Sequence, residues 1–294
     1  MNISRGEKQF RIVNYGFLAI LALLTLYPFV YVLSASLSSS AAVASGEVVL
    51  LPKEMTLNAY QKVISQKGIW LAYANTVFYT LVGTLVNLLF TVLGAYPLSK
   101  RRLALGGAVS MLIAVTLFIN MSGSFGMIPF YLNLRDFGLL DSRLGVIIAF
   151  AVSTFYVFLM RTFFQSVPEA LEEAAKVDGA NDWQVLWRIY LPLSVPSLTT
   201  IGLFYAVGRW NSYFWSMIML QDESKLPLQV LLRKLIVEMK LTEEMLNVGD
   251  IAAGISKETI IYATIIVSIL PVVLVYPFIQ GYFVKGMIVG AIKE

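Results

Sequence analysis

Long stretches without a single charged residue constrain this chain more than any other feature. They cover residues 12–46, 68–99, 103–134, 144–160, 189–206 and 259–284. A transmembrane α-helix needs about 20 consecutive apolar residues to cross a bilayer. Most of these stretches reach that length, and the fifth does so if it continues past Arg209 to Leu220. The pattern therefore predicts an all-α membrane protein with six transmembrane helices.

Composition agrees with a membrane protein and excludes several kinds of chemistry. Hydrophobic residues make up 58% of the chain and charged residues only 14%, which is far from a soluble average. The chain has no cysteine and no histidine, so it lacks the usual ligands of structural zinc and the partners of Ser-His or Cys-His catalysis. The net charge of +4 does not indicate a nucleic-acid partner. The absence of cysteine and histidine excludes structural zinc, haem and Ser-His or Cys-His catalysis within this chain, for which we expect no catalytic residue, metal ion or cofactor.

The expected helices differ in regularity. We place five of them at about residues 12–37, 70–98, 144–164, 194–220 and 259–284. A further helix begins near Leu105 and becomes irregular at residues 120–129, where glycines and a proline occur. Irregular backbone at membrane depth is tolerated only beside protein or a water-filled cavity. This segment is therefore expected to lie beside other protein segments or beside such a cavity.

Basic residues near helix ends indicate the orientation of the chain in the membrane. They are divided almost equally between the two sides, but those on the N-terminal side lie in much shorter segments. This density places residues 1–11, the loop 166–192 and the tail 288–294 in the cytoplasm, and the loop 221–257 outside. Residues 12–287 then form one six-helix domain. Its first apolar run is too long for a cleavable signal peptide.

The loop 166–192 is strongly charged and begins with a predicted helix. Pro168 suits a helical first turn, because its missing N–H has no partner there. Glu169 and Glu172 then lie near the positive end of the helix dipole. Gly179 can adopt the left-handed conformation that ends a helix. The first helix is therefore expected to end just before Gly179.

A second short helix is predicted directly afterwards, with Asp182 as its N-cap. Its apolar residues fall at i, i+3, i+4 and i+7, which is one helical face; they are Trp183, Leu186, Trp187 and Tyr190. Pro192 ends this helix. The residues alone allow two interpretations of the loop. It either meets a partner in water or lies with its aromatic stripe on lipid headgroups.

The loop resembles the cytoplasmic loop of ABC-importer permeases. The matching segments are Glu173-Ala174-Ala175, Asp178-Gly179-Ala180 and Leu191-Pro192. The resemblance implies the transmembrane fold of type I ABC importers, with a cytoplasmic coupling helix that fits into a cleft of the ATPase subunit. It implies that the ATPase-docking residues are Glu173, Ala174, Ala175, Asp178, Gly179, Ala180, Asp182 and Trp183.

Further segments are similar to carbohydrate-uptake permeases related to the smaller maltose-transporter subunit. These segments are Leu51-Pro52, Ile128-Pro129-Phe130-Tyr131 and Trp210-Asn211-Ser212. Two further segments, Leu226-Pro227-Leu228-Gln229 and the ending at residues 276–286, resemble the branch that serves oligosaccharides, including uronate-bearing ones. The family implies a bacterial plasma (inner) membrane location. It also implies a second homologous permease, two ATP-binding cassette subunits and an extracytoplasmic solute-binding protein.

The chain contains no Gly-rich phosphate loop ending in Gly-Lys-Ser/Thr, which an ATPase of this type needs. ATP and Mg²⁺ are therefore expected to be used by a separate ATPase subunit. This chain is expected to be half of a pore for sugars or oligosaccharides. A permease for another small polar solute and a channel without ATP coupling remain alternatives.

Polar residues within the predicted membrane helices are the candidates for contact with substrate. Asn75 and Asn87 are expected to form hydrogen bonds between helices. Arg209 differs, because a charge inside a span costs at least about 2.5–3.5 kcal/mol on insertion scales. No acidic residue lies in a predicted membrane helix, so the counter-charge of Arg209 would come from a loop, the partner permease or the substrate. The candidate substrate path comprises Asn120, Ser122, Arg209, Trp210 and Asn211; a structural role for Arg209 is the alternative.

Two other classes of membrane protein are disfavoured by the residues. An intramembrane protease needs either a Ser-His pair or two aspartates within the membrane, and the aspartates of this chain fall in predicted loops. A proton-coupled carrier commonly uses acidic or histidine relays inside its helices. Neither set of residues is available here, so a transport subunit driven from outside the chain is the leading hypothesis.

Overall fold

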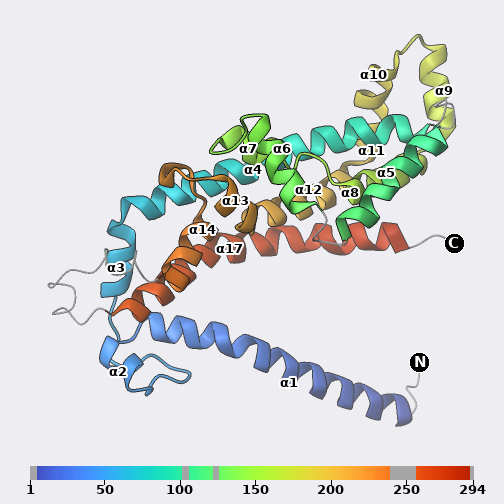
Figure 1. Ribbon diagram of the computed structural model, residues 1–294. Coiled ribbons are helices and arrows are strands. Elements are labelled where there is room, and N and C mark those ends of the chain that lie inside the picture. The colour runs from blue at the N-terminus through green and yellow to red at the C-terminus, as the bar shows by residue number, and fades with distance from the viewer. Residues whose placement is uncertain (1–4, 101–105, 122–125, 239–255, 292–294) are drawn as a thin grey trace. The chain divides into compact units, whose positions relative to one another are not determined.

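The computed structural model describes residues 5–100, 106–121, 126–238 and 256–291, and within these ranges it contains helices and no strand. It divides into two compact units, residues 1–70 with 231–273 and residues 71–230 with 274–294. Figure 1 shows the helices of each unit. The all-α class predicted from the sequence is confirmed for the described residues.

Within the described residues, three helices are long and apolar enough to cross a membrane. They are Gly6–Ser36 within α1 (Arg5–Ser36), α4 (Lys67–Ser99) and Lys257–Pro277 within α17 (Lys257–Ala291). A fourth candidate is the pair Asp182–Leu193 and Val195–Trp210, which is bent by 81°. These correspond to the first, second, sixth and fifth predicted spans. The described residues therefore form a multi-pass membrane protein by the length and composition of their helices.

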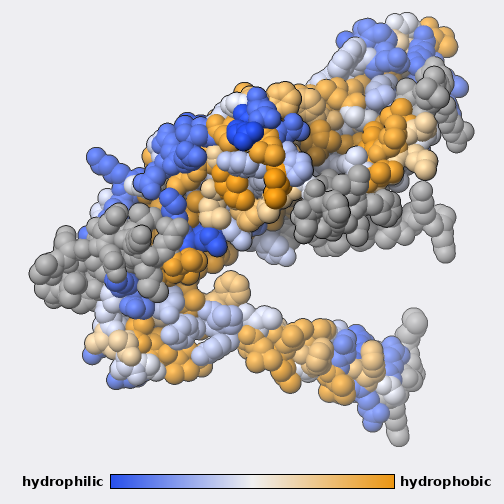
Figure 2. Space-filling view, in the orientation of Figure 1, coloured by the Kyte–Doolittle hydropathy of each residue, from blue (hydrophilic) through white to orange (hydrophobic). Residues whose placement is uncertain are grey.

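The first unit contains α1, α2 (Ser40–Ala44), α3 (Asn58–Ser65), η3 (Lys234–Glu238) and part of α17. Apolar side chains cover α1 along most of its length, as the orange surface in Figure 2 shows. These side chains are largely exposed, which suits a helix surrounded by lipid. At the end of α1, Ala35 forms a small buried cluster with Ala42 and Val48 from the residues that follow the helix.

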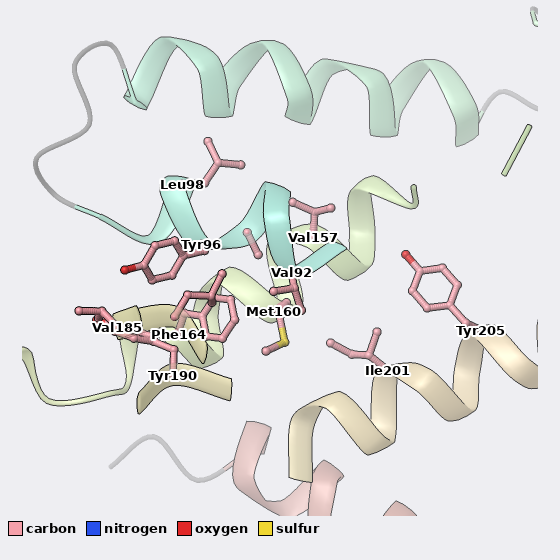
Figure 3. Close-up of a cluster of buried hydrophobic side chains, with 12 residues drawn as sticks. Val92, Tyr96, Leu98, Val157, Met160, Phe164, Val185, Tyr190, Ile201 and Tyr205 are labelled. Carbon is pink, nitrogen blue, oxygen red and sulfur yellow. The ribbon is translucent and has the colours of Figure 1, made fainter. Parts of the chain in front are cut away.

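The second unit is built around α4. Its remaining helices are α5 (Gly106–Met121), α6 (Met127–Asp136), α7 (Arg143–Ile148), α8 (Thr154–Gln165), α9 (Glu169–Val177), α10 (Asp182–Val185), η1 (Leu186–Tyr190), α11 (Leu191–Leu193), α12 (Val195–Trp210), α13 (Phe214–Met219), η2 (Glu223–Lys225), the first part of α14 (Leu228–Arg233) and the last part of α17. Its largest core joins α4, α8, η1 and α12, and Figure 3 shows Tyr96, Phe164, Tyr190 and Ile201 in this cluster. The core therefore connects the charged loop directly to membrane helices.

The fourth predicted helix, residues 144–164, is not continuous. The structure has α7, a non-helical segment at residues 149–153, and then α8. The fifth is likewise divided into α12 and α13, with a short break at residues 211–213. The prediction of two uninterrupted helices is therefore wrong at these positions. The residues that stabilise the first break come from other helices.

The amides in α4 have different partners. Asn87 donates from Nδ2 to the carbonyl of Phe150, at 2.7 Å, which links α4 to the break. Its Oδ1 accepts from Arg209 of α12 at 2.7 Å, which is the predicted bond between helices. Asn75 instead donates to the carbonyls of Ser224 and Leu226, at 2.8 and 3.1 Å. It thereby anchors the start of the loop 221–257. Its Oδ1 also accepts a hydrogen bond of 3.1 Å from Nη2 of Arg143, the first residue of α7, so it joins two helices as predicted. Both amides have a structural role in the described residues.

Candidate functional site

The first helix of the charged loop ends in a complete left-handed cap. Pro168 is the N-cap of α9, and Gly179 follows the helix with φ of +82°. The Gly179 N–H donates to the carbonyl of Lys176 at 3.0 Å, and the Ala180 N–H donates to that of Ala175 at 2.9 Å. This pair of bonds is the Schellman motif, which normally requires glycine at the left-handed position. The prediction that Gly179 ends this helix in the left-handed conformation is confirmed.

The second helix begins one residue earlier than expected. Asn181, not Asp182, is its N-cap. The Gln184 N–H donates to Oδ1 of Asn181, and the Asn181 N–H donates to Oε1 of Gln184, both at 2.9 Å. This reciprocal capping box satisfies two N–H groups at once. Asp182 instead forms an ion pair with Lys176 at 3.2 Å, which joins the two helices across the turn.

The predicted aromatic stripe is divided between two surfaces. Leu186 and Tyr190 are buried in the core, whereas the side chains of Trp183 and Trp187 are 60% and 56% exposed. Residues 186–190 form a π-helical turn, which rotates the chain away from ordinary helical spacing. The prediction of a single apolar face is therefore wrong. Two tryptophans remain on the outside of the elbow formed by α9 and α10.

A buried ion network holds this elbow against α4. The side chain of Glu172 is only 4% exposed. It accepts hydrogen bonds from Lys100, from Lys176 at 2.8 Å and from the hydroxyl of Tyr190 at 2.8 Å. Lys100 Nζ also lies 4.2 Å from the ring centre of Tyr96 and 3.8 Å from that of Tyr190. One carboxylate thus connects the end of α4, α9 and η1.

Glu172 is ionised over a wide pH range because of these donors. Burial alone raises its pKa, but the hydrogen bonds from Lys100, Lys176 and Tyr190 outweigh that effect and lower the pKa from 4.5 to about 2. The same contact raises the pKa of Lys176. From the sequence, Glu172 is expected only near the positive end of the helix dipole, and its network with Lys100 and Tyr190 is a finding of the structure. In the sequence, only the i,i+4 spacing of Glu172 and Lys176 indicates one of these contacts.

Most of the predicted docking residues are accessible. Six of the eight are exposed, and these are Glu173, Ala174, Asp178, Gly179, Asp182 and Trp183. Ala175 and Ala180 are half-buried and pack against the core. In Figure 1 the elbow of α9 and α10 lies at one end of the second unit. The elbow therefore presents polar groups and an indole ring on one exposed surface.

The second unit also contains a cavity of about 500 Å³ beside the break between α7 and α8. Its lining combines aromatic rings with a few polar groups, as ligand sites commonly do. It includes Asn87, Phe150, Ser153, Tyr156, Phe204, Tyr205, Arg209, Ser212 and Trp215. Tyr156 and Phe204 are stacked, with ring centres 5.9 Å apart.

Arg209 lies in the wall of this cavity and is bound by neutral oxygens. Its Nε and Nη2 donate to Oδ1 of Asn87 at 3.2 and 2.7 Å. Its Nη1 donates to the carbonyl of Val146 at 2.7 Å. Its Nη2 also donates to the carbonyls of Ile147 and Phe150, at 2.8 and 3.0 Å. Within the described residues, these oxygens stabilise the charge in place of a carboxylate.

Of the other predicted path residues, Trp210 and Asn211 do not join Arg209 in the cavity wall. Trp210 instead packs edge-on against Tyr73, with ring centres 6.4 Å apart. Asn211 donates from Nδ2 to the carbonyl of Val207 at 2.9 Å. The side chain of Asn120 and the whole of Ser122 lie outside the described residues. A contact between any of these residues and substrate stays a prediction.

Several apolar helices together with an exposed polar elbow define a membrane transport component. The chain belongs to the family of binding-protein-dependent transport system inner membrane components, which matches residues 68–289. It is therefore the permease part of an ATP-driven importer, and ATP is hydrolysed by a separate subunit. The resemblance recognised in the sequence is confirmed.

Related proteins are similar over almost their whole length. The polygalacturonan/rhamnogalacturonan transport system permease protein of Bacillus subtilis (strain 168) is 39% identical, over 98% of this chain and 99% of the relative. The lactose transport system permease protein of Rhizobium radiobacter is 27% identical, over 96% of each chain.

Solved structures of bacterial ABC transporters contain chains that are similar to this one. A chain from the crystal structure of a bacterial ABC transporter involved in the import of the acidic polysaccharide alginate has a TM-score of 0.88 and 46% identity. The match covers 96% of this chain and 99% of that one. A second match, from the bacterial alginate ABC transporter in complex with an alginate pentasaccharide-bound periplasmic protein, has a TM-score of 0.62 and 16% identity. It covers 93% of each chain and shows the fold alone.

Proposed function

We propose that this chain forms half of the translocation pore of an importer for acidic oligosaccharides. It crosses the membrane six times with both termini in the cytoplasm, and the elbow of α9 and α10 is its coupling element. The observation that carries this proposal is the elbow itself. It has an exposed left-handed turn at Gly179 and exposed rings at Trp183 and Trp187, within a family of inner membrane transport components.

The elbow has the properties that a docking element needs. Its exposed residues surround a short, fixed turn, so the surface is preorganised rather than ordered on binding. Exposed tryptophans are frequent anchors at protein interfaces. The network around Glu172 connects this surface to α4. A displacement of the elbow by a closing ATPase would therefore be transmitted to a membrane helix.

Acidic oligosaccharides are proposed as substrates on the basis of the relatives. The names of two similar proteins refer to polygalacturonan and to alginate, and both of these polymers consist of uronate sugars. Another relative, at 27% identity, is named for the neutral sugar lactose. The greater similarity to the first two supports a uronate-bearing substrate. A neutral oligosaccharide is the alternative.

The proposed assembly contains a second homologous permease, two ATP-binding cassette subunits and an extracytoplasmic solute-binding protein. The family description names binding-protein-dependent transport, and one structural neighbour was solved with a periplasmic protein bound to an oligosaccharide. In this assembly the cavity beside Arg209 belongs to the translocation path. Its aromatic rings supply flat apolar surfaces for sugar rings, and its hydroxyls supply hydrogen bonds.

Uptake by the reconstituted complex tests the proposed function. We expect ATP-dependent accumulation of a labelled galacturonate or mannuronate oligosaccharide in proteoliposomes, delivered by the binding protein. An excess of unlabelled uronate oligosaccharide should abolish it, whereas a neutral oligosaccharide of equal length should not. Equal competition by the neutral sugar would contradict the acidic class. Uptake without ATP would favour a channel that is not coupled to ATP.

A further inference from the structure

The break between α7 and α8 is held by two side chains from α12. A helix that stops within the membrane leaves carbonyls without intrahelical partners at its end and N–H groups at the start of the next helix. Such groups are costly in an apolar environment unless protein or water satisfies them. At this break, Arg209 binds carbonyl groups at the end of α7, and Tyr205 binds an N–H group at the start of α8.

Arg209 binds the carbonyl end. Val146 and Ile147 belong to the last turn of α7, and Phe150 follows directly in the break. All three carbonyls accept hydrogen bonds from the guanidinium, at 2.7 to 3.0 Å. A cation at this position also interacts favourably with the negative end of a helix dipole. The charge of Arg209 is thus directed at the backbone.

Tyr205 binds the other end. Ser153 is the N-cap of α8, and its N–H donates to Oη of Tyr205 at 3.2 Å. That oxygen is fixed in turn by a hydrogen bond of 2.8 Å with Oγ1 of Thr91. Tyr205 and Arg209 are four residues apart and therefore lie on the same face of α12. One helical face thus holds both ends of the interruption.

The facing surface of α4 is shaped to fit this pair. Gly83, Asn87 and Thr91 are spaced at i, i+4 and i+8, which places them along one face. Asn87 binds Arg209, and Thr91 binds Tyr205. A Cβ atom on Gly83 would lie 2.9 Å from Nε of Arg209, closer than such atoms normally approach. The glycine therefore leaves the space through which the arginine reaches the break.

The geometry points to Arg209 and Tyr205 as positioning residues for transport. Together with Asn87 and Thr91 they fix the interrupted segment, residues 149–153, and this segment forms one wall of the cavity beside it. The guanidinium acts on the backbone of the break and not on a substrate carboxylate. Broken helices commonly border the substrate sites of membrane transporters. This inference rests on the proposed transport function.

Variants at Gly83 and Arg209 test the inference, with Gly94→Ala in the same helix as the control. A Cβ on Gly94 would meet its nearest neighbour, Val157, at an ordinary 3.7 Å. We expect Arg209→Gln to lower the maximal uptake rate of acidic and neutral oligosaccharides by the same factor. That factor is about tenfold or more, as for the loss of charge-assisted hydrogen bonds. Arg209→Lys should not rescue uptake, because Lys lacks the planar fork.

Gly83→Ala is the decisive variant, because it keeps the positive charge of Arg209 but displaces the guanidinium from the break. We expect it to reproduce the uptake defect of Arg209→Gln, whereas Gly94→Ala should transport normally. If Arg209→Gln prevents assembly of the complex, the uptake rates of Gly83→Ala and Gly94→Ala still test the inference. Selective loss of acidic uptake in Arg209→Gln, together with normal uptake in Gly83→Ala, would overturn the inference.

Cysteine reactivity gives a readout that is independent of transport. Ala151 lies within the break and is only 9% exposed, and the chain has no native cysteine. In the purified complex, Ala151→Cys should react slowly with a maleimide. It should react about tenfold faster when combined with Gly83→Ala, because the break is no longer held. Unchanged reactivity would contradict the positioning role even if the transported substrate proves to be different.

Discussion

Replacing Gly179 with leucine is expected to abolish most ATP-driven uptake while the protein still reaches the membrane. The φ of +82° at this residue costs a residue with a side chain about 1–2 kcal/mol. The surrounding space is open, because a Cβ atom would meet nothing within 4 Å. The effect is therefore one of backbone strain at the turn. We expect uptake to fall by about tenfold or more, as a change in the direction of α10 would misplace the docking surface.

Gly179→Asn provides the matched control. Asparagine tolerates the left-handed conformation better than other residues with side chains. It should therefore retain more uptake than leucine, although both add atoms at the same place. Membrane insertion and binding of the second permease should be normal in both variants. Normal sugar-stimulated ATP hydrolysis by the complex with leucine would contradict a coupling role for the elbow.

Replacing Glu172 with leucine should cause the largest loss of stability among single changes in the elbow. It would leave Lys100 near the core without its carboxylate partner. Removing one partner of a buried ion pair typically costs about 3–5 kcal/mol. We expect a clear fall in the thermal unfolding temperature of the purified complex and a lower yield of assembled transporter.

Two further variants distinguish the loss of the buried network from the loss of a single charge. Lys176 is more exposed than Lys100, so Lys176→Gln should cost only about 0–1 kcal/mol, as for surface ion pairs. The double variant Lys100→Met, Glu172→Leu should recover much of the stability, because no lone charge remains. If Glu172→Leu unfolded at the same temperature as the parent protein, the network would not support the elbow.

The contribution of Glu172 to the stability of the folded protein depends on pH in a definite direction. The pKa of Glu172 is lowered from 4.5 to about 2, so its ionised form is favoured by folding. Its contribution to stability is complete above pH 4.5 and is lost as the pH falls towards about 2. Glu172→Gln should therefore lack this part of the acid sensitivity in the same unfolding measurement.

Features that depend on local composition were predictable from the sequence. The spans in α1, α4 and α17 follow from long apolar runs, which have few alternatives to a membrane helix. The end of α9 was predicted at Gly179 because a left-handed cap nearly always needs glycine. These features require no knowledge of which segments are neighbours in space.

Features that depend on distant partners were not predictable. The apolar run 144–164 has no signal for its interruption, because Arg209 and Tyr205 stabilise it from another helix. The burial of Glu172 depends on Lys100, which is 72 residues away. The π-helical turn at residues 186–190 divides the aromatic stripe in a way that regular periodicity cannot indicate.

Cross-linking from Trp183 tests the central proposal most directly, since that proposal places the elbow against the ATPase in the cytoplasm. Trp183→Cys, in a chain without native cysteine, would be combined with a short bifunctional reagent in the assembled complex. Gln221→Cys, at the start of the proposed external loop, is the matched control, because both side chains are exposed. We predict a covalent product with the ATP-binding cassette subunit from position 183 and none from position 221. A product from position 221, or none from position 183 in a transport-competent complex, would contradict docking of the elbow on the ATPase in the cytoplasm.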